Sequence, residues 1–242
     1  MNSQYDDESF FEAYSDMPRS RGGLAAAGEW RRLEPLLPEL YGKKVLDLGC
    51  GFGWHCKYAA AHGAKEVIGL DSSEKMLARA KAINGDARIR YRLGSLESFD
   101  FSGEDFDLAL SNLALHYVRE LEPVYRRVYA ALKPGGSFVF NIEHPCFTAA
   151  PRQQWITDSE GRALYWPVDN YYFPGERETV FLGQKVMKYH HTLTQILNPL
   201  PALGFRLTAV IEAEPPESMR GLPGMADEMR RPMMLLVSAQ KE

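Results

Sequence analysis

Short apolar runs alternate with amphipathic stretches along most of the chain. The apolar runs predict buried strands, and apolar residues spaced three and four apart between them predict helices. Strands are predicted at residues 44–49, 66–70, 88–93, 106–110, 137–142, 205–213 and 233–239. Helices are predicted at residues 53–62, from 73 onward, at 121–132 and at 191–203. This alternation predicts a mostly parallel α/β sheet whose right-handed crossovers bring the carboxyl ends of the strands to one edge.

The residues before the first predicted strand have a pattern of their own. Residues 24–37 have the spacing of a helix, which a proline then ends. This helix either packs on the outer face of the sheet, or the segment forms a lid over the ligand edge. In the second case Tyr14, Arg19 and Trp30 are expected to face the ligand.

A second interruption of the rhythm follows the strand at 137–142. Residues 144–190 are rich in Pro, Tyr and Trp and are too apolar for a disordered linker, so we expect an insertion above the active edge. Residues 215–232 are expected to form an exposed loop. The expected parts are an N-terminal helical lid segment (1–43), a ligand-binding core (44–143), a substrate cap (144–190) and the C-terminal part of the core sheet (191–242).

The stretch at residues 44–53 carries a strong chemical signal. It reads Lys-Val-Leu-Asp-Leu-Gly-Cys-Gly-Phe-Gly, a pattern that predicts a buried strand turning sharply into a helix. Glycine lets the backbone bend there and lie close to a ligand. The N–H groups at the start of the helix suit a polar or anionic group. Asp47 lies near the edge where open parallel sheets bind their ligands.

The spacing of the glycines narrows the choice of ligand. It is Gly-x-Gly-x-Gly rather than the dinucleotide fingerprint Gly-x-Gly-x-x-Gly, and the Gly-Lys-Ser/Thr of a phosphate-binding loop is absent. Asp71 ends the second predicted strand, where a carboxylate can accept hydrogen bonds from ribose hydroxyls. With Asp47, this gives two acids and few basic residues, which fits a cationic nucleoside better than a pyrophosphate.

Composition limits the partners. The 242 residues are 45% hydrophobic and 25% charged, with a net charge of -4, which argues against sequence-independent nucleic-acid binding. No apolar run approaches the ~18 residues of a membrane span, and the N-terminus lacks a signal-peptide pattern, so a cytoplasmic location is expected. Three cysteines without a CxxC pair predict no disulfide framework and no metal site. Oligomeric state stays open, with a homodimer as one option.

At this point the chain resembles the class I S-adenosylmethionine-dependent methyltransferases, close to small-molecule enzymes that include the quinone-biosynthesis C-methyltransferases. The resemblance covers residues 40–143 and implies a Rossmann-like three-layer sandwich. Its sheet would have seven mostly parallel strands with an antiparallel last strand, and an inserted cap would follow strand five. The motifs that carry it, in order, are Val45-Leu46-Asp47-Leu48-Gly49-Cys50-Gly51-Phe52-Gly53, Gly69-Leu70-Asp71-Ser72-Ser73, residues 106–117 and Leu132-Lys133-Pro134-Gly135-Gly136.

The resemblance implies S-adenosylmethionine as the cofactor, with S-adenosylhomocysteine as product. Asp71 would hold the ribose, and Asn112 with its two successors would border the methionine part. Ser95 stands where the family often has an acid near the adenine, so adenine contacts fall to Ser95 and Leu96. The expected cofactor-binding residues are Tyr14, Arg19, Asp47, Gly49, Cys50, Gly51, Asp71, Ser72, Met76, Ser95, Leu96, Asn112, Leu113 and Ala114.

Methyl transfer from a sulfonium is an in-line displacement. Alignment of the reactants can lower the barrier by roughly 7–11 kcal/mol, and a general base is needed only if the nucleophile carries a proton. The candidate bases are His116, Glu143 and His144. The candidate substrate residues are Tyr117, Tyr171, Tyr172, Arg177, His190 and His191. Ordinary structural roles remain open for each of these residues.

The sequence therefore favours an enzyme that transfers a methyl group to a small-molecule acceptor. One alternative is a cofactor-binding regulatory or scaffold subunit without turnover. Another is a protein or RNA methyltransferase, which the acidic charge and the lack of a basic extension disfavour for nucleic acid.

Overall fold

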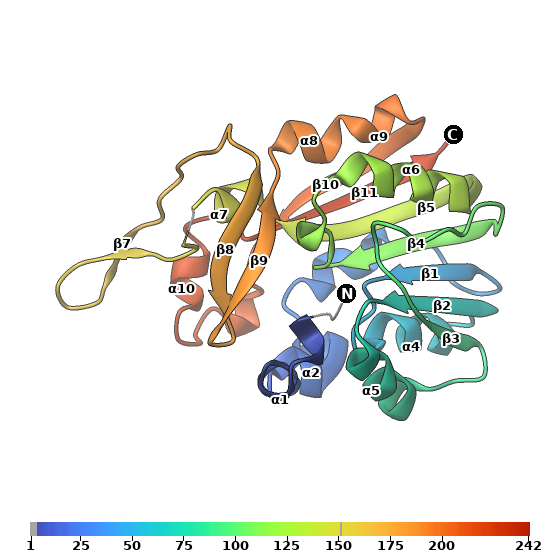
Figure 1. Ribbon diagram of the computed structural model, residues 1–242, viewed down its shortest axis with the longest axis horizontal. Helices are drawn as coiled ribbons and strands as arrows, with labels where there is room; N and C mark the ends of the chain where they lie inside the picture. The colour runs from blue at the N-terminus through green and yellow to red at the C-terminus, as the bar shows by residue number, and fades with distance from the viewer. Residues whose placement is uncertain (1–3, 151) are drawn as a thin grey trace.

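The computed structural model describes residues 4–150 and 152–242, and a seven-stranded sheet forms its centre (Figure 1). The strand order is β10-β11-β5-β4-β1-β2-β3. Strand β11 is antiparallel to both of its neighbours, and the other neighbouring pairs are parallel. The predicted fold class is therefore confirmed. The strands are β1 (Lys44–Leu48), β2 (Glu66–Asp71), β3 (Ile89–Leu93), β4 (Phe106–Asn112), β5 (Leu132–Glu143), β10 (Phe205–Ala213) and β11 (Met234–Lys241).

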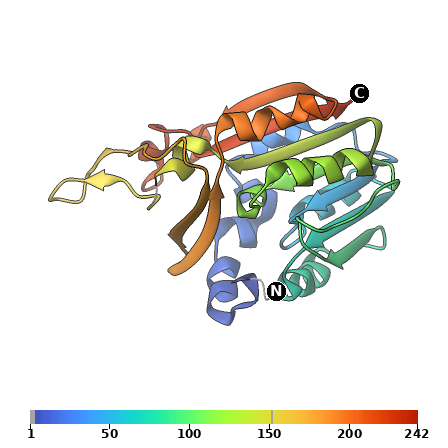
Figure 2. The ribbon, with the colours of Figure 1, turned by 45° about the horizontal axis from the view of Figure 1, so that its top comes forward.

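Helices cover both faces of the sheet, because successive strand side chains point to opposite sides. Leu46 and Leu48 pack in one core with α6 (Leu121–Ala131), α8 (Leu193–Leu197) and α9 (Pro199–Ala202). Val45 packs in the other core with α3 (Trp30–Leu33), α4 (Trp54–Ala61) and α5 (Glu74–Asn84). The result is a three-layer arrangement, visible from two sides in Figures 1 and 2.

Two predicted helices are wrong as continuous elements. Residues 24–37 form three short pieces, which are the 3-10 helix η2 (Gly23–Ala26), α3 and the 3-10 helix η3 (Glu34–Leu36). Residues 191–203 are split between α8 and α9. Pro35 at the junction of α3 and η3, and Pro199 at the junction of α8 and α9, lack the N–H that a continuing helix needs. The break between η2 and α3 contains Gly28, which weakens a helix interior. Apolar spacing persists across the break in 191–203 because Ile196 of α8 and Leu200 of α9 pack in the same core.

The N-terminal segment lies beside the carboxyl edge of the sheet (Figure 1). It contains the 3-10 helix η1 (Gln4–Asp6), α1 (Glu8–Ser15) and α2 (Pro18–Gly22). Helix α1 begins at Asp7, whose carboxylate accepts a hydrogen bond from the Phe10 N–H at 3.0 Å, a typical N-cap. On the other side of the same edge lies the insertion that leaves β5.

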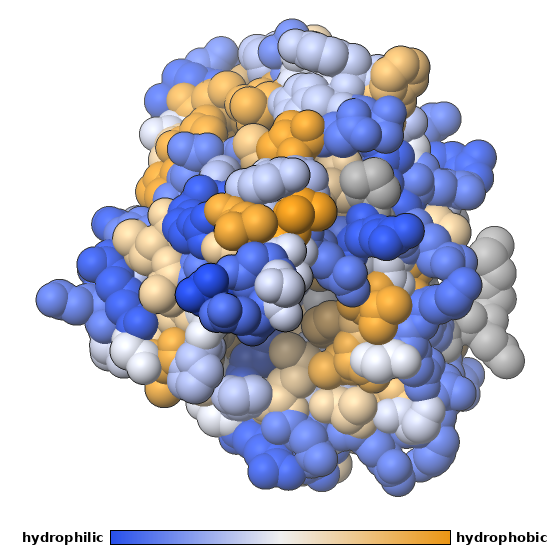
Figure 3. Space-filling model, turned by 90° about the vertical axis from the view of Figure 1, so that its left-hand side faces the viewer, coloured by the Kyte–Doolittle hydropathy of each residue, from blue (hydrophilic) through white to orange (hydrophobic). Residues whose placement is uncertain are grey.

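The insertion starts with α7 (Pro145–Ala149) and forms two hairpins, β6 (Ile156–Thr157) with β7 (Ala163–Tyr165) and β8 (Gly175–Phe181) with β9 (Gln184–His190). The first hairpin projects from the body as an arm (Figures 1 and 2). Figure 3 looks at the end from which it projects, where apolar and polar side chains are intermixed.

The segment expected as an exposed loop, 215–232, is only partly irregular. It contains the 3-10 helix η5 (Glu217–Met219) and α10 (Met225–Glu228), and Pro216 is buried. Among the described residues, no helix is long and apolar enough to cross a membrane.

Candidate functional site

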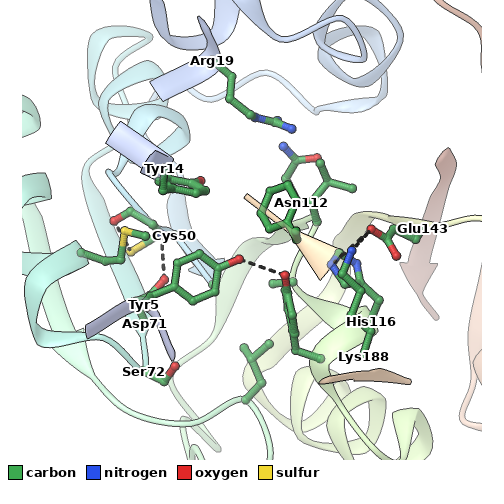
Figure 4. Close-up of a pocket in the computed structure, with 18 of the residues that line it drawn as sticks. Tyr5, Tyr14, Arg19, Cys50, Asp71, Ser72, Asn112, His116, Glu143 and Lys188 are labelled. Carbon is green, nitrogen blue, oxygen red and sulfur yellow. Dashed lines mark hydrogen bonds and ion pairs between the residues drawn. The ribbon is translucent and has the colours of Figure 1, made fainter. Parts of the chain in front are cut away.

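A cavity of about 690 Å³ lies at the carboxyl edge of the sheet. The ends of β1, β2, β4 and β5 line it, together with the N-terminal segment on one side and the β8–β9 hairpin on the other. We call the region around Gly49, Gly51 and Asp71 the glycine end, and the region around His116, Glu143 and Lys188 the histidine end. Figure 4 shows both ends facing one continuous space.

The turn after β1 shapes the glycine end. Gly49, Gly51 and Gly53 all have positive φ, with +77° at Gly49. A Cβ at Gly49 would lie 2.3 Å from the Cβ of Ala114, so only glycine fits. The N–H groups of Gly49 and Cys50 both donate to the carbonyl of Leu70, at 2.8 and 3.0 Å. These bonds fix the turn against the end of β2.

Asp71, the last residue of β2, lines the cavity beside this turn. Its Oδ2 accepts from the Gly51 N–H at 2.8 Å, and its Oδ1 accepts from the Ser73 N–H at 3.0 Å. Burial raises the pKa of Asp71, while these backbone donors act in the opposite direction. Asp71 is thus oriented by backbone groups on both sides.

Asp47 does not line the cavity but lies beneath the turn. It is 1% exposed, and its Oδ2 accepts a hydrogen bond from the Cys56 thiol at 3.2 Å. Burial raises the pKa of Asp47 to about 7, and the charge of Asp71 adds to this shift. The structure therefore places Asp47 as a support of the turn.

Arg19 and Asn112 belong to a polar network along one wall. Arg19 pairs with the buried Glu29, and the Asn112 Nδ2 donates to Glu29 Oε1 at 3.0 Å. The Asn141 Nδ2 in turn donates to Asn112 Oδ1 at 2.8 Å. Trp30, expected beside Arg19 in the lid, instead packs edge-on against Tyr58 and does not line the cavity.

The histidine end contains three buried ionisable side chains. Glu143 Oε1 lies 2.5 Å from Lys188 Nζ and 3.9 Å from His116 Nε2. Burial lowers the pKa of His116 to about 4, so its imidazole is neutral at neutral pH. Burial alone would raise the pKa of Glu143, but His116 and Lys188 outweigh it and the pKa lies below its ordinary value. His116 Nδ1 is buried and has no hydrogen-bond partner among the described residues.

Most of the predicted cofactor residues line the cavity, but only some of the predicted catalytic and substrate residues do. Apart from Asp47, every predicted cofactor residue lines the cavity, and so do His116, Glu143 and Tyr117. His144 does not. It caps α7, accepting from the Cys146 N–H at 3.0 Å, and its Nε2 lies 3.0 Å from Glu212 Oε1.

The remaining substrate predictions fall outside the cavity lining. Tyr172 is 84% exposed. The Arg177 guanidinium donates to the carbonyls of Phe173 and Asn170. His190 contacts the Thr148 hydroxyl and the Tyr171 carbonyl, and His191 contacts the Val118 carbonyl. The contacts of Arg177 and His190 lie within the insertion, and the contact of His191 joins its end to the segment after β4.

Sequence reasoning missed Tyr5, Gln153 and Lys188, which line the cavity. Tyr5 donates to the Tyr117 hydroxyl at 3.0 Å. The strand pattern of β9 contained a signal for Lys188, because it lies on the same alternating face as the buried Val186 and His190. A lysine on the apolar face of a strand is costly unless it is paired.

The comparisons with known proteins identify the family of the chain. A sequence model described as "Methyltransferase domain" matches residues 46–140. A candidate S-adenosylmethionine-dependent methyltransferase from Listeria monocytogenes is 49% identical, with a TM-score of 0.86 over 91% of this chain and 99% of its own. An S-adenosylmethionine-dependent methyltransferase from Mesorhizobium loti is 45% identical, with a TM-score of 0.83 over 90% of this chain and 100% of its own.

A curated enzyme matches a shorter stretch. The malonyl-[acyl-carrier protein] O-methyltransferase of Erwinia billingiae is 38% identical over 100 residues, which are 41% of this chain and 39% of that enzyme. Taken together, these similarities define the class. The chain belongs to the class I S-adenosylmethionine-dependent methyltransferases. It is an enzyme whose cofactor is S-adenosylmethionine.

Proposed function

We propose that this enzyme methylates a small molecule bound at the histidine end of the cavity. The observation that carries the proposal is the single continuous space between the glycine end and the buried His116. A cofactor at one end and an acceptor at the other would meet within it. Because in-line displacement requires nucleophile, methyl carbon and sulfur to align, such a space can supply much of the catalysis.

In this proposal the cofactor lies along the glycine turn. Asp71 accepts hydrogen bonds from the ribose hydroxyls, and the glycine turn lets the backbone approach the ligand closely. The methionine part extends toward Asn112 and Arg19. Ser95, Leu96 and Met76 border the adenine. All of these residues line the cavity, and Asp47 acts through the turn above it.

His116 then serves as the general base for an acceptor that carries a proton. With its Nε2 toward Glu143, the proton of the neutral ring is best placed on Nε2, which leaves the Nδ1 lone pair to accept a proton from the acceptor. Burial lowers the pKa of His116 to about 4, so the ring is a weaker base than one whose pKa lies near neutral pH, where general bases are most effective. The proton transfer therefore relies on Glu143. Glu143 orients the ring and stabilises the imidazolium that forms.

The size of the cavity and the charge of the chain support a small acceptor. A volume of about 690 Å³ falls in the range of small-molecule pockets, roughly 300–1,000 Å³. The net charge of -4 disfavours nucleic acid as acceptor. The N-terminal segment and the β8–β9 hairpin both contribute to the lining, which limits the room for a folded macromolecule.

Calorimetric titration with S-adenosylhomocysteine tests the cofactor assignment. The parent protein is expected to bind in the micromolar range, and Asp71→Asn to lose about 1.5–3 kcal/mol through lost charge-assisted hydrogen bonds. The exposed Asp105 provides the matched control, since Asp105→Asn should bind like the parent. Equal affinity in Asp71→Asn would remove the ribose assignment.

Transfer of a labelled methyl group tests the acceptor class. The enzyme is incubated with S-adenosylmethionine and a cell extract that has been divided into low-molecular-mass and macromolecular fractions. We expect label in a low-molecular-mass product, with strongly reduced transfer by His116→Ala. Label confined to protein or RNA would contradict the proposal.

A further inference from the structure

Lys188 belongs to strand β9 of the inserted hairpin and lies at the histidine end of the cavity. In the sequence it is far from the methyltransferase motifs. Its side chain is 5% exposed and lines the cavity. A buried ammonium is expensive unless it is paired, and here Glu143 Oε1 accepts its hydrogen bond at 2.5 Å. Nζ also lies 5.3 Å from the centre of the Phe181 ring. Burying this ammonium costs desolvation free energy, so its position on the cavity wall indicates a role in binding or catalysis rather than in stability.

The ammonium has hydrogen-bonding capacity left over. A lysine Nζ carries three N–H donors. Among the described residues, the ammonium donates a hydrogen bond to Glu143 Oε1. Two donors are therefore available to an oxygen atom of a bound molecule.

The same Glu143 oxygen connects Lys188 to His116. It lies 2.5 Å from the ammonium nitrogen and 3.9 Å from His116 Nε2, and Figure 4 shows the three side chains converging. His116 Nδ1 is buried without a partner in the described part of the chain. His116, Glu143 and Lys188 line the same cavity, so an acceptor hydroxyl bound at this wall would have both the imidazole and the ammonium beside it.

The surroundings constrain the acceptor. The charges of Glu143 and Lys188 cancel, and His116 is neutral, so the cluster offers no net charge to attract a strongly ionic molecule. Gln153 also reaches this end, and its Nε2 donates to Glu143 Oε2 at 3.3 Å. The other side chains here are apolar or aromatic: Tyr117, Phe147, Phe181, Met187, Tyr189 and Met233. These features favour a flat, neutral molecule with an acidic O–H.

We propose that Lys188 is a further catalytic residue that binds the acceptor oxygen and stabilises its developing negative charge, and that the acceptor is a phenol or enol methylated on oxygen. This inference rests on the proposed function of the cavity. The acceptor O–H proton passes to His116 Nδ1, and an oxygen lone pair forms a bond to the methyl carbon. The carbon–sulfur bond breaks with its electron pair remaining on sulfur, which gives the methyl ether and S-adenosylhomocysteine.

Binding of 4-nitrophenol to the complex with S-adenosylhomocysteine tests the proposal, because the phenolate has a visible absorption band that the neutral phenol lacks. The titration is made at a pH where free 4-nitrophenol is mostly protonated. We expect the band to appear on binding to the parent. Lys188→Met should weaken binding at least tenfold and abolish the band.

Two further variants separate this role from a structural one. The double variant Glu143→Gln with Lys188→Met leaves no unpaired buried carboxylate, and it should bind S-adenosylhomocysteine normally but also lack the band. Lys185→Met removes an exposed lysine of the same strand, paired with Glu178, and should behave like the parent.

Several results would overturn the inference. One is a parent complex that binds no 4-nitrophenol at millimolar concentration, and another is an equal phenolate band in Lys188→Met. Failure of the parent to bind S-adenosylhomocysteine would instead count against the placement of the cofactor in this cavity. The two proposals therefore fail by different observations.

Discussion

At the residue scale, the glycine end depends on positions where a side chain has no room. Gly49 combines a φ of +77° with a Cβ position 2.3 Å from Ala114. Gly103 has a nearly equal φ of +74°, but a Cβ there would meet nothing within 4 Å. A substituted residue would adopt an unfavourable positive φ at both positions, but its side chain would clash with a neighbour only at Gly49.

We predict that Gly49→Ala lowers the free energy of unfolding more than Gly103→Ala does. The left-handed conformation alone costs an L-residue about 1–2 kcal/mol, and the clash with Ala114 should add about 1–3 kcal/mol. Urea denaturation measures both. Gly49→Ala should also weaken S-adenosylhomocysteine binding, whereas equal effects of the two substitutions would contradict the steric argument.

Asp47 gives the protein a stability that depends on pH. Its folded-state pKa of about 7 exceeds the ordinary value of about 3.9 in an unfolded chain. Between these values the folded protein holds a proton that the unfolded chain has released. The free energy of unfolding therefore falls as pH rises from about 4 to about 7, by roughly 2–4 kcal/mol.

We predict that Asp47→Asn removes this dependence in the ligand-free protein. The variant should be more stable than the parent at pH 8 and similar to it near pH 4, as measured by urea denaturation across pH. Asp105→Asn, at an exposed site, should keep the parent's profile. An unchanged pH slope in Asp47→Asn would show that the buried carboxylate does not cause it.

At the element scale, the N-terminal segment is fastened on both sides of the cavity. Asp6 Oδ1 accepts from the Ser73 hydroxyl at 2.7 Å and from the Lys75 N–H at 3.2 Å. On the other side, the Gln4 amide donates to the Lys185 carbonyl at 2.7 Å. The segment thus joins the start of α5 to the β8–β9 hairpin.

We predict that Asp6→Ala speeds dissociation of S-adenosylhomocysteine about fivefold, because two hydrogen bonds that hold the segment over the glycine end are lost. Stopped-flow displacement measures the rate. Asp16→Ala serves as control, since that carboxylate is exposed and pairs with Arg21. An unchanged rate would mean that the segment does not control release.

At the scale of the whole molecule, the β6–β7 arm lies apart from the sheet and the cavity (Figures 1 and 2). No residue between 154 and 174 lines the cavity, and Leu164 and Tyr165 on the arm are 50% and 58% exposed. A two-stranded hairpin is marginally stable by itself. The arm should therefore open locally without unfolding the core.

We predict that trypsin first cleaves after Arg162, whose side chain is 72% exposed in the arm, and that the nicked protein still binds S-adenosylhomocysteine. Mass spectrometry of a time course locates the cut, and Arg162→Gln should delay it. An earlier cut within the seven-stranded sheet, or loss of binding on nicking, would contradict the separation of arm and core.

The agreement between sequence and structure is closest where contacts are local. The strand predicted at 205–213 matches β10. The glycine turn follows β1 and leads into α4 as predicted, because a strand, its turn and the next helix follow one another directly. The predictions of one continuous helix at 24–37 and at 191–203 were wrong. Apolar spacing indicates which residues are buried, but it does not indicate where the backbone hydrogen bonds of a helix are interrupted. The insertion was recognised, but its pocket-facing residues were not.

By itself the sequence determined the class of fold, the position of the glycine turn and most of the residues at the glycine end, because the period of apolar residues and the conformational freedom of glycine act over a few neighbouring positions. At the histidine end the sequence named His116 and Glu143 as candidates, but only the tertiary structure decided what these residues meet. Lys188 meets Glu143 across 45 residues of sequence, and Tyr5 meets Tyr117 across 112. Such pairings depend on how the insertion and the N-terminal segment pack over the sheet edge. The alternation of polar and apolar positions specifies which faces of an element are buried, but it does not specify which other elements those faces contact.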